Sequence, residues 1–115
     1  MSDGSRVGDF LQQMRQASLD AIAFAEGMDR ETFTSDLRTQ RAVIMSLMIV
    51  GEAATKLIVE DPTFVDQHPK IPWRDMRGMR NRIAHGYFDV DLDVVWRTVR
   101  DELPDLVRRL DKLEG

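Results

Sequence analysis

The sequence contains no cysteine. Disulfides, thiolate zinc sites and a cysteine nucleophile are therefore excluded, and the composition fits a reducing cytosol, where we expect the protein to act. Residues 1–6 are polar, and no signal-type apolar run follows them. The longest apolar stretch, residues 42–50, is interrupted by Ser46 and is too short to span a bilayer. The sequence therefore predicts no membrane association.

The chain also lacks an excess of positive charge, because its formal net charge is −4 at pH 7. Taken alone, this value argues against a general nucleic-acid-binding protein, and no DNA partner is expected. The charge is unevenly distributed, however. Residues 70–85 carry a net charge of +4, which leaves −8 for the rest of the chain. A basic segment on an acidic protein predicts a local anion site rather than a groove that follows many phosphates.

Strand signals are weak throughout, since no segment shows sustained alternation of apolar and polar residues. Apolar residues recur instead at helical spacing. The sequence predicts an all-α fold, an up-and-down bundle of four main helices with one or two short extra helices, in one domain over residues 1–115. The main helices are expected at about residues 7–25, 35–60, 73–85 and 92–113.

Several residues indicate where these helices begin, end or bend. Gly27 is a plausible stop for the first helix, and Asp36 and Asp91 suit the starts of two others. Gly86 is predicted to close the third helix in a left-handed C-cap conformation. Pro104 lies within the fourth helix and removes a backbone hydrogen bond, so a kink or break is expected there.

The second main helix, residues 35–60, is apolar around nearly its whole circumference over residues 42–50. Such a helix must be buried on more than one side. The second burying surface could be the core of the same domain or another subunit. The small residues Gly51, Ala53 and Ala54 permit close approach of a neighbouring helix. Glu52 is expected to pair with Lys56 one helical turn later, and a role in an interface also remains open.

Residues 80–87, Arg-Asn-Arg-Ile-Ala-His-Gly-Tyr, form the strongest candidate site. The guanidinium of Arg80 can bind phosphate through a planar fork of donors. The imidazole of His85 can carry a proton near neutral pH. Together these groups suit phosphodiester chemistry without a metal, and no compact group of metal-ligating residues is evident in the sequence.

On an ideal helix over residues 73–85, Arg80 lies near the edge of the core face, and Arg77 and Asn81 lie on the same flank. His85 points about 140° away from Arg80. The long reach of Arg80 and the turn of the chain at Gly86 could still bring the two groups together, and a second subunit could also supply the opposing group. The core face is predicted to carry Met76, Met79 and Ile83.

Each of these residues also has an ordinary structural interpretation. A histidine in the last turn of a helix is favoured by the helix dipole. Arginines on a helix flank are usually solvated or paired with acids, and Tyr87 could be a packing residue. Spacing alone favours these interpretations over a catalytic one.

The octapeptide resembles the Arg-x4-His-x-Tyr motif of HepT-like proteins, a branch of the HEPN superfamily. Further segments are similar to that family, and the resemblance extends from about residue 11 to residue 110. These segments are Gly51-Glu52-Ala53-Ala54, Ile71-Pro72-Trp73-Arg74, residues 91–96 and Leu103-Pro104.

The resemblance implies an all-helical homodimer that is the toxin of a toxin–antitoxin pair. It implies a metal-independent ribonuclease without cofactor, with Arg80 and His85 as catalytic residues in a cleft at the dimer interface. Asn81 is the polar residue that usually follows the arginine, and with Arg77 it is expected to support phosphate binding. The implied partner is a minimal nucleotidyltransferase, the antitoxin, which attaches AMP to Tyr87.

Two functional hypotheses follow. The first is the toxin of a type VII HEPN/MNT toxin–antitoxin system, an endoribonuclease that cleaves RNA and is neutralised by AMPylation of Tyr87. The second is a catalytically silent HEPN module that binds a nucleotide or regulates a partner nucleotidyltransferase. The net charge of −4 slightly favours the second hypothesis, and the intact set of Arg80, His85 and Tyr87 favours the first.

Overall fold

The computed structural model describes residues 3–114, and this part of the chain contains helices and no strand. The predicted all-α class, with four main helices and short additional ones, is confirmed. In chain order the elements are α1 (Asp3–Phe24), α2 (Arg30–Thr34), α3 (Leu37–Glu60), α4 (Pro62–Gln67), α5 (Trp73–His85), the 3-10 turn η1 (Tyr87–Asp89), α6 (Leu92–Arg97), the π-helical turn η2 (Thr98–Glu102) and α7 (Leu103–Glu114).

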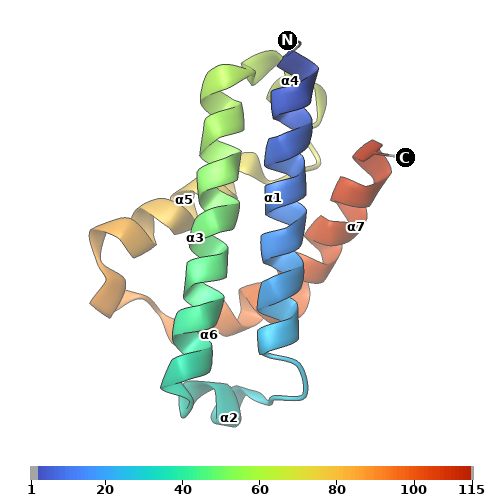
Figure 1. Ribbon diagram of the computed structural model, residues 1–115. Helices are drawn as coiled ribbons and strands as arrows, with labels where there is room; N and C mark the ends of the chain where they lie inside the picture. The colour runs from blue at the N-terminus through green and yellow to red at the C-terminus, as the bar shows by residue number, and fades with distance from the viewer. Residues whose placement is uncertain (1–2, 115) are drawn as a thin grey trace.

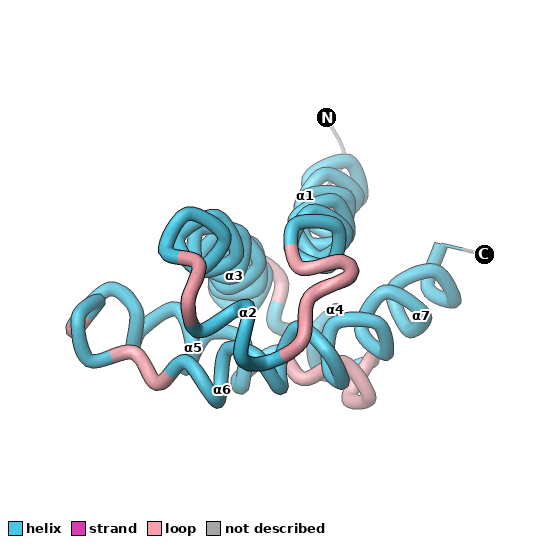
Figure 2. The backbone as a smooth tube through the Cα atoms, turned by 90° about the horizontal axis from the view of Figure 1, so that it is seen from below, coloured by secondary structure: helices cyan, strands magenta, loops and turns pink. Residues whose placement is uncertain are grey.

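The helices form two layers. The long helices α1 and α3 run side by side and antiparallel in one layer, and α5 and the α6–η2–α7 segment cross behind them (Figure 1). Seen from below, α1 and α3 lie on one side and α5, α6 and α7 on the other (Figure 2). Each helix can therefore bury an apolar stripe against the opposite layer. Fully buried side chains between the layers include Met14, Phe33, Val43, Leu57, Val95 and Leu110.

Local capping explains most of the helix boundaries. The Asp36 carboxylate accepts hydrogen bonds from the backbone N–H and the hydroxyl of Thr39, and so begins α3 as predicted. Asp91 caps α6 in the same way. Gly27 follows α1 with a φ of 81°, a conformation that glycine adopts without a steric penalty. The prediction for Gly86 is wrong: its φ is −154°, because the chain leaves α5 directly into η1 rather than through a left-handed cap.

The predicted break near Pro104 is confirmed and takes the form of η2. Proline has no N–H, and its ring collides with the carbonyl four residues earlier in a regular α-helix. Here the backbone N–H of Leu103 donates to the carbonyl of Thr98, five residues back. The wider turn separates α6 from α7, and the long helix expected over residues 92–113 therefore bends.

Helix α3 is only partly buried. By length and composition it could cross a membrane, and half of an apolar 18-residue stretch within it is buried inside the fold. One side of α3 faces away from both α1 and α5. Large apolar side chains at least 42% exposed lie along α3 at Leu37, Met45, Ile49 and Val59. We call Leu37, Met45 and Ile49, which repeat at multiples of four residues on one face, the α3 stripe.

Candidate active site

Helix α5 carries all but one of the predicted site residues, and Tyr87 follows it in η1. Met76 and Ile83 anchor α5 in the core and Met79 is half-buried, which confirms the predicted core face. The remaining residues of α5 therefore divide between a flank that faces α3 and a flank that faces α6. The basic segment of residues 70–85 is thereby brought largely onto one helix.

On the flank that faces α3, Arg80 is fixed by two hydrogen bonds. Its Nε donates to Oε1 of Glu52 at 2.5 Å, and its Nη1 donates to Oδ1 of Asn81 at 2.6 Å. The Arg80 side chain is 26% exposed, so it lies at the core edge as predicted. The structure thus brings Arg80 and Asn81 together. Since Asn81 accepts through its oxygen, its amide nitrogen remains a donor for an anion.

Gly51 of α3 makes this arrangement possible. A Cβ at position 51 would collide with Cβ of Arg80 and lie 2.7 Å from the carbonyl oxygen of Met76. The two helices therefore approach too closely at this point for any other residue. This is the close helix approach that the small residues Gly51, Ala53 and Ala54 predict.

Sequence reasoning missed the role of Glu52. The structure pairs it with Arg80, 28 residues later, rather than with Lys56 on its own helix. The available signal was Gly51 immediately before it, which marks the contact point with α5. Which residue of α5 lies opposite could not be read from the sequence.

His85 lies in the last turn of α5, is exposed, and belongs to a different environment. It lines a pocket of about 380 Å³ between α5 and the segment leading into α6. Arg80 does not line this pocket, so within one protomer the two predicted catalytic groups are not brought into one pocket. The other lining residues are Met79, Arg82, Gly86, Asp89, Val90, Asp91 and Val94.

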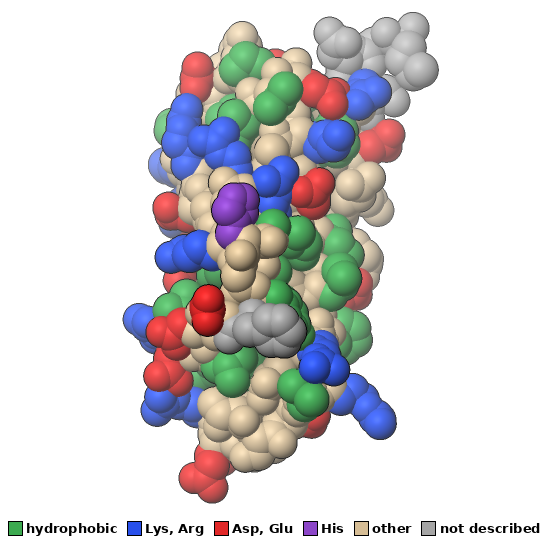
Figure 3. Space-filling view, turned by 90° about the vertical axis from the view of Figure 1, so that its left-hand side faces the viewer, with side chains coloured by type: hydrophobic (Ala, Val, Ile, Leu, Met, Phe, Trp, Pro, Cys, Tyr) green, Lys and Arg blue, Asp and Glu red, His purple; other side chains and the backbone are tan. Residues whose placement is uncertain are grey.

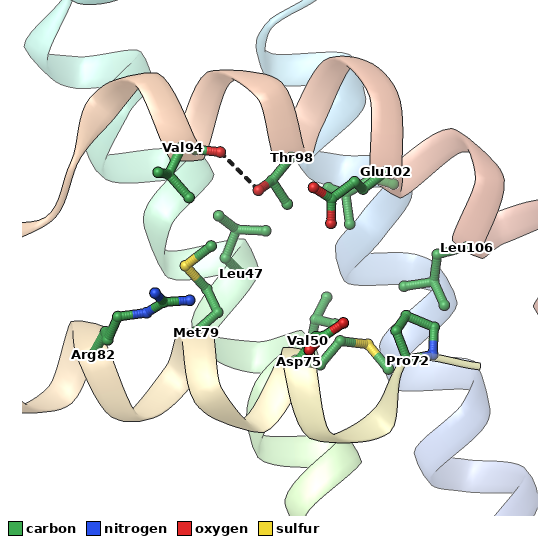
Figure 4. A pocket seen from close by; sticks show the side chains of 12 residues that line it. Leu47, Val50, Pro72, Asp75, Met79, Arg82, Val94, Thr98, Glu102 and Leu106 are labelled. Atoms are coloured by element: carbon green, nitrogen blue, oxygen red, sulfur yellow. Dashed lines mark hydrogen bonds between the residues drawn. The ribbon is translucent and has the colours of Figure 1, made fainter. Parts of the chain in front are cut away.

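A second pocket, of about 270 Å³, lies between α5 and the α6–η2–α7 segment (Figure 4). Its floor is apolar and comes partly from Leu47 and Val50 of α3. The carboxylates of Asp75 and Glu102 lie on opposite walls, and the Arg82 side chain reaches toward Met79 from α5 (Figure 4).

The two remaining predicted residues lie nearby. Arg77 is half-buried one turn before Arg80 and Asn81. Tyr87 opens η1 two residues after His85, and its side chain is 38% exposed. Among residues 3–114, no cluster of three or more metal-ligating side chains occurs. The molecular face around the projecting end of α5 displays basic side chains and a histidine, with hydrophobic side chains alongside (Figure 3).

The protein is a small all-helical domain. One of its helices carries a fixed guanidinium and an exposed imidazole, and these two groups suit phosphodiester chemistry. The sequence comparison narrows this class of domain. A family model described as "Ribonuclease HepT-like" matches residues 14–113. The chain belongs to the HepT-like ribonuclease family, which confirms the predicted family and the predicted endoribonuclease class.

Individual relatives agree with the family match. The chain is 41% identical over 105 residues to the "Probable ribonuclease HepT" of Thermococcus cleftensis, covering 91% of this chain and 93% of that protein. A relative in Caldanaerobacter subterraneus, named as a candidate RNase, is 33% identical over 104 residues, 90% of each chain. A Methanocaldococcus jannaschii protein with a similar name is 32% identical over 107 residues, 93% of this chain and 86% of its own. No solved structure matches the chain.

Proposed function

We propose that the protein is the toxin of a type VII HEPN/MNT toxin–antitoxin system and acts in the cytoplasm as a metal-independent endoribonuclease. The observation that carries the proposal is that the two proposed catalytic residues of the family octapeptide have different environments. Arg80 is held in a fixed orientation by Glu52 and Asn81, whereas His85 is exposed at the end of the same helix.

The chemistry uses the nucleophile that RNA itself contains. The 2′-oxygen attacks phosphorus while His85 accepts its proton, and the bond from phosphorus to the 5′-oxygen breaks. A second, protonated His85 donates a proton to the departing 5′-oxygen. Arg80 stabilises the negative charge that develops on the phosphoryl oxygens, and Asn81 and Arg77 add donors on the same flank. The products are a 2′,3′-cyclic phosphate and a 5′-hydroxyl.

The need for two histidines supports a homodimer. The α3 stripe gives a second copy of this chain an apolar surface to cover, and Glu52 lies one turn beyond Ile49 on the same helix. A two-fold axis along this surface would bring two Arg80 flanks close to each other. In this arrangement the cleft between subunits joins groups that one protomer keeps apart.

Disruption of the α3 stripe tests the homodimer. Ile49→Asp should convert the dimer to a monomer and abolish cleavage, because a carboxylate would be buried without a partner. Sedimentation velocity measures the oligomeric state. Phe24→Asp, at an exposed apolar position at the end of α1, is the matched control and should leave the dimer intact. A dimeric, active Ile49→Asp variant would place the interface elsewhere.

The catalytic assignment is tested by RNA cleavage in the presence of EDTA. His85→Ala should lose about 10²–10⁴-fold in rate, the usual contribution of a general acid or base. Arg80→Ala should lose about 10²–10³-fold. Arg74→Ala, an exposed arginine at the other end of α5, controls for the loss of one positive charge. Undiminished cleavage by either active-site variant contradicts its assignment, and loss of cleavage with EDTA contradicts metal independence.

The proposed partner is a minimal nucleotidyltransferase that attaches AMP to Tyr87. An AMP group there would place a phosphate and a nucleoside two residues from His85, where they would obstruct RNA. Co-expression with a minimal nucleotidyltransferase should increase the intact mass by one or more AMP units. Tyr87→Phe should prevent the increase, whereas modification of the phenylalanine variant would exclude Tyr87.

The alternative is a catalytically silent module that binds a nucleotide or regulates the nucleotidyltransferase. The observation that favours it is the Glu52 carboxylate on Arg80, which partly neutralises the guanidinium. This alternative predicts nucleotide or partner binding by a purified dimer that does not cleave RNA. Cleavage that depends on both Arg80 and His85 rules it out.

A further inference from the structure

The two pockets beside α5 join into one groove. They share three lining residues, Met79, Arg82 and Val94, and therefore meet between α5 and α6. The joined groove runs from Glu102 and Leu106 at one end to His85 and Gly86 at the other. We call it the α5–α6 groove.

Arg82 is the cation in the centre of this groove. Four carboxylates line the same two pockets, yet the Arg82 guanidinium makes no ion pair or side-chain hydrogen bond with any residue that the structure describes. Those carboxylates belong to Asp75, Asp89, Asp91 and Glu102. Arg80, in contrast, already has two partners. All five donors of Arg82 are thus available to an incoming acceptor.

The arrangement also groups Arg82 with His85. The two residues are three positions apart on α5, so their side chains point about 60° from each other, and both line the pocket at the end of the helix. Within one protomer, the guanidinium on the side of the imidazole is therefore Arg82 rather than Arg80.

The rest of the groove suits the other parts of a nucleotide. Met79 and Val94 form an apolar surface next to Arg82, with Leu47 and Val50 beneath. Methionine packs well against the face or edge of an aromatic ring. The carboxylates of Asp75 and Glu102 can accept hydrogen bonds from base amino groups, and those of Asp89 and Asp91 from ribose hydroxyls. Their negative charge would repel further phosphates, so the groove fits a single phosphate.

We propose that the α5–α6 groove is a subsite for one nucleotide of the RNA substrate, adjacent to the phosphate on which His85 acts. Arg82 binds the phosphate of that nucleotide, and its base packs on Met79 and Val94. The identity of the substrate rests on the proposed function, but binding at this site does not require cleavage.

Binding of a fluorescent single-stranded RNA to the His85→Ala protein tests the subsite, because this background prevents turnover. Adding Arg82→Ala should weaken binding about tenfold at low salt, since a charge-assisted contact to phosphate is lost. It should also reduce the slope of log K against log salt concentration by about 0.7, the value for one phosphate of a single strand. Arg82→Lys should retain the slope and recover only part of the affinity, because lysine lacks the planar fork.

Arg74→Ala is the matched control, since Arg74 is an exposed arginine of α5 without an ion pair in the described part of the chain, and it lies outside the α5–α6 groove. Equal losses in the Arg74→Ala and Arg82→Ala proteins would indicate a general charge effect and overturn the subsite. Unchanged RNA affinity in the Arg82→Ala protein would also overturn the subsite. This holds even if that variant no longer binds the nucleotidyltransferase.

Methionine methyl NMR tests the base contact independently. Saturating RNA should shift the Met79 signal, assigned with Met79→Leu, and leave in place the signal of Met14, which is fully buried in α1 and lines neither pocket. An unmoved Met79 signal overturns the base contact.

If RNA binds with these properties but wild-type protein does not cleave it, the proposed ribonuclease fails and the subsite stands. If RNA is cleaved and Arg82→Ala has no effect on affinity or rate, the subsite alone fails.

Discussion

The flank of α5 that faces α3 is closed by packing, whereas the flank that faces α6 opens into two pockets. On the closed flank, Gly51 leaves room for Cβ of Arg80 and the backbone carbonyl of Met76, and Glu52 and Asn81 fix the Arg80 side chain. On the open flank, Arg82 and His85 lack side-chain partners among the described residues. One helix therefore carries two kinds of arginine, one oriented by the protein and one left for a ligand. The comparison indicates that the closed flank supplies rigidity and the open flank supplies binding.

Gly51→Ala should have the largest effect on the closed flank. The added Cβ would collide with Cβ of Arg80 and lie 2.7 Å from the backbone carbonyl oxygen of Met76, and these atoms can yield only if the two helices separate. We expect a loss of about 3 kcal/mol in the free energy of unfolding, within the range for an overpacked core position. Urea denaturation followed by circular dichroism measures it. A denaturation midpoint equal to that of the wild type would show that the contact between α3 and α5 is looser than described.

Glu52→Ala should have the next largest effect, and it should lower activity while leaving the stability of the fold nearly unchanged. Glu52 is 49% exposed, so its ion pair adds little to folding. Without it Arg80 can leave its position, and we expect kcat to fall about tenfold, equivalent to about 1.4 kcal/mol. KM should not rise, because removing a negative charge favours RNA. Steady-state kinetics checks both constants. Glu60→Ala, which removes a carboxylate paired with Arg6 at the far end of α3, should leave kcat unchanged.

Gly78→Ala should change the free energy of unfolding in the opposite direction to Gly51→Ala. Gly78 lies inside α5, and a Cβ there meets nothing within 4 Å. Replacing glycine by alanine in such a helix position stabilises by about 0.5–1 kcal/mol, because the unfolded chain loses less entropy on folding. The same urea experiment measures the gain. A destabilised Gly78→Ala protein would show that the solvent side of α5 is more crowded than the structure indicates.

The smallest expected effect is a loss of stability in acid, which arises where aspartate carboxylates cap the helices. Hydrogen bonds from the backbone and side chain of Thr39 hold the pKa of Asp36 below its usual value of 3.8. A depressed carboxylate pKa stabilises the folded state above the ordinary pKa, and this stability is lost as pH falls through the lower folded value. The melting temperature of the wild type should therefore fall more steeply below about pH 4 than that of Asp36→Asn. Parallel slopes would contradict this.

Predictions from sequence succeeded where the cause is local. Asp36, Asp91 and Gly27 act on backbone groups within a few residues of themselves, and each marks a helix boundary as expected. Pro104 disturbs its own helix, so the break was also predictable, although its π-helical form was not. Gly86 was predicted wrongly, because its conformation depends on the following turn η1 as well as on the end of α5.

The sequence by itself determined the all-α class, the main helices and the octapeptide that marks the family, because helical periodicity, capping and a contiguous motif are written in neighbouring residues. Only the tertiary structure decided that Glu52 is the partner of Arg80 and that Arg82 shares a pocket with His85. Both results depend on how α5 packs across α3 and beside α6. That placement arises from the packing of buried side chains distant in the sequence, and no local pattern encodes it.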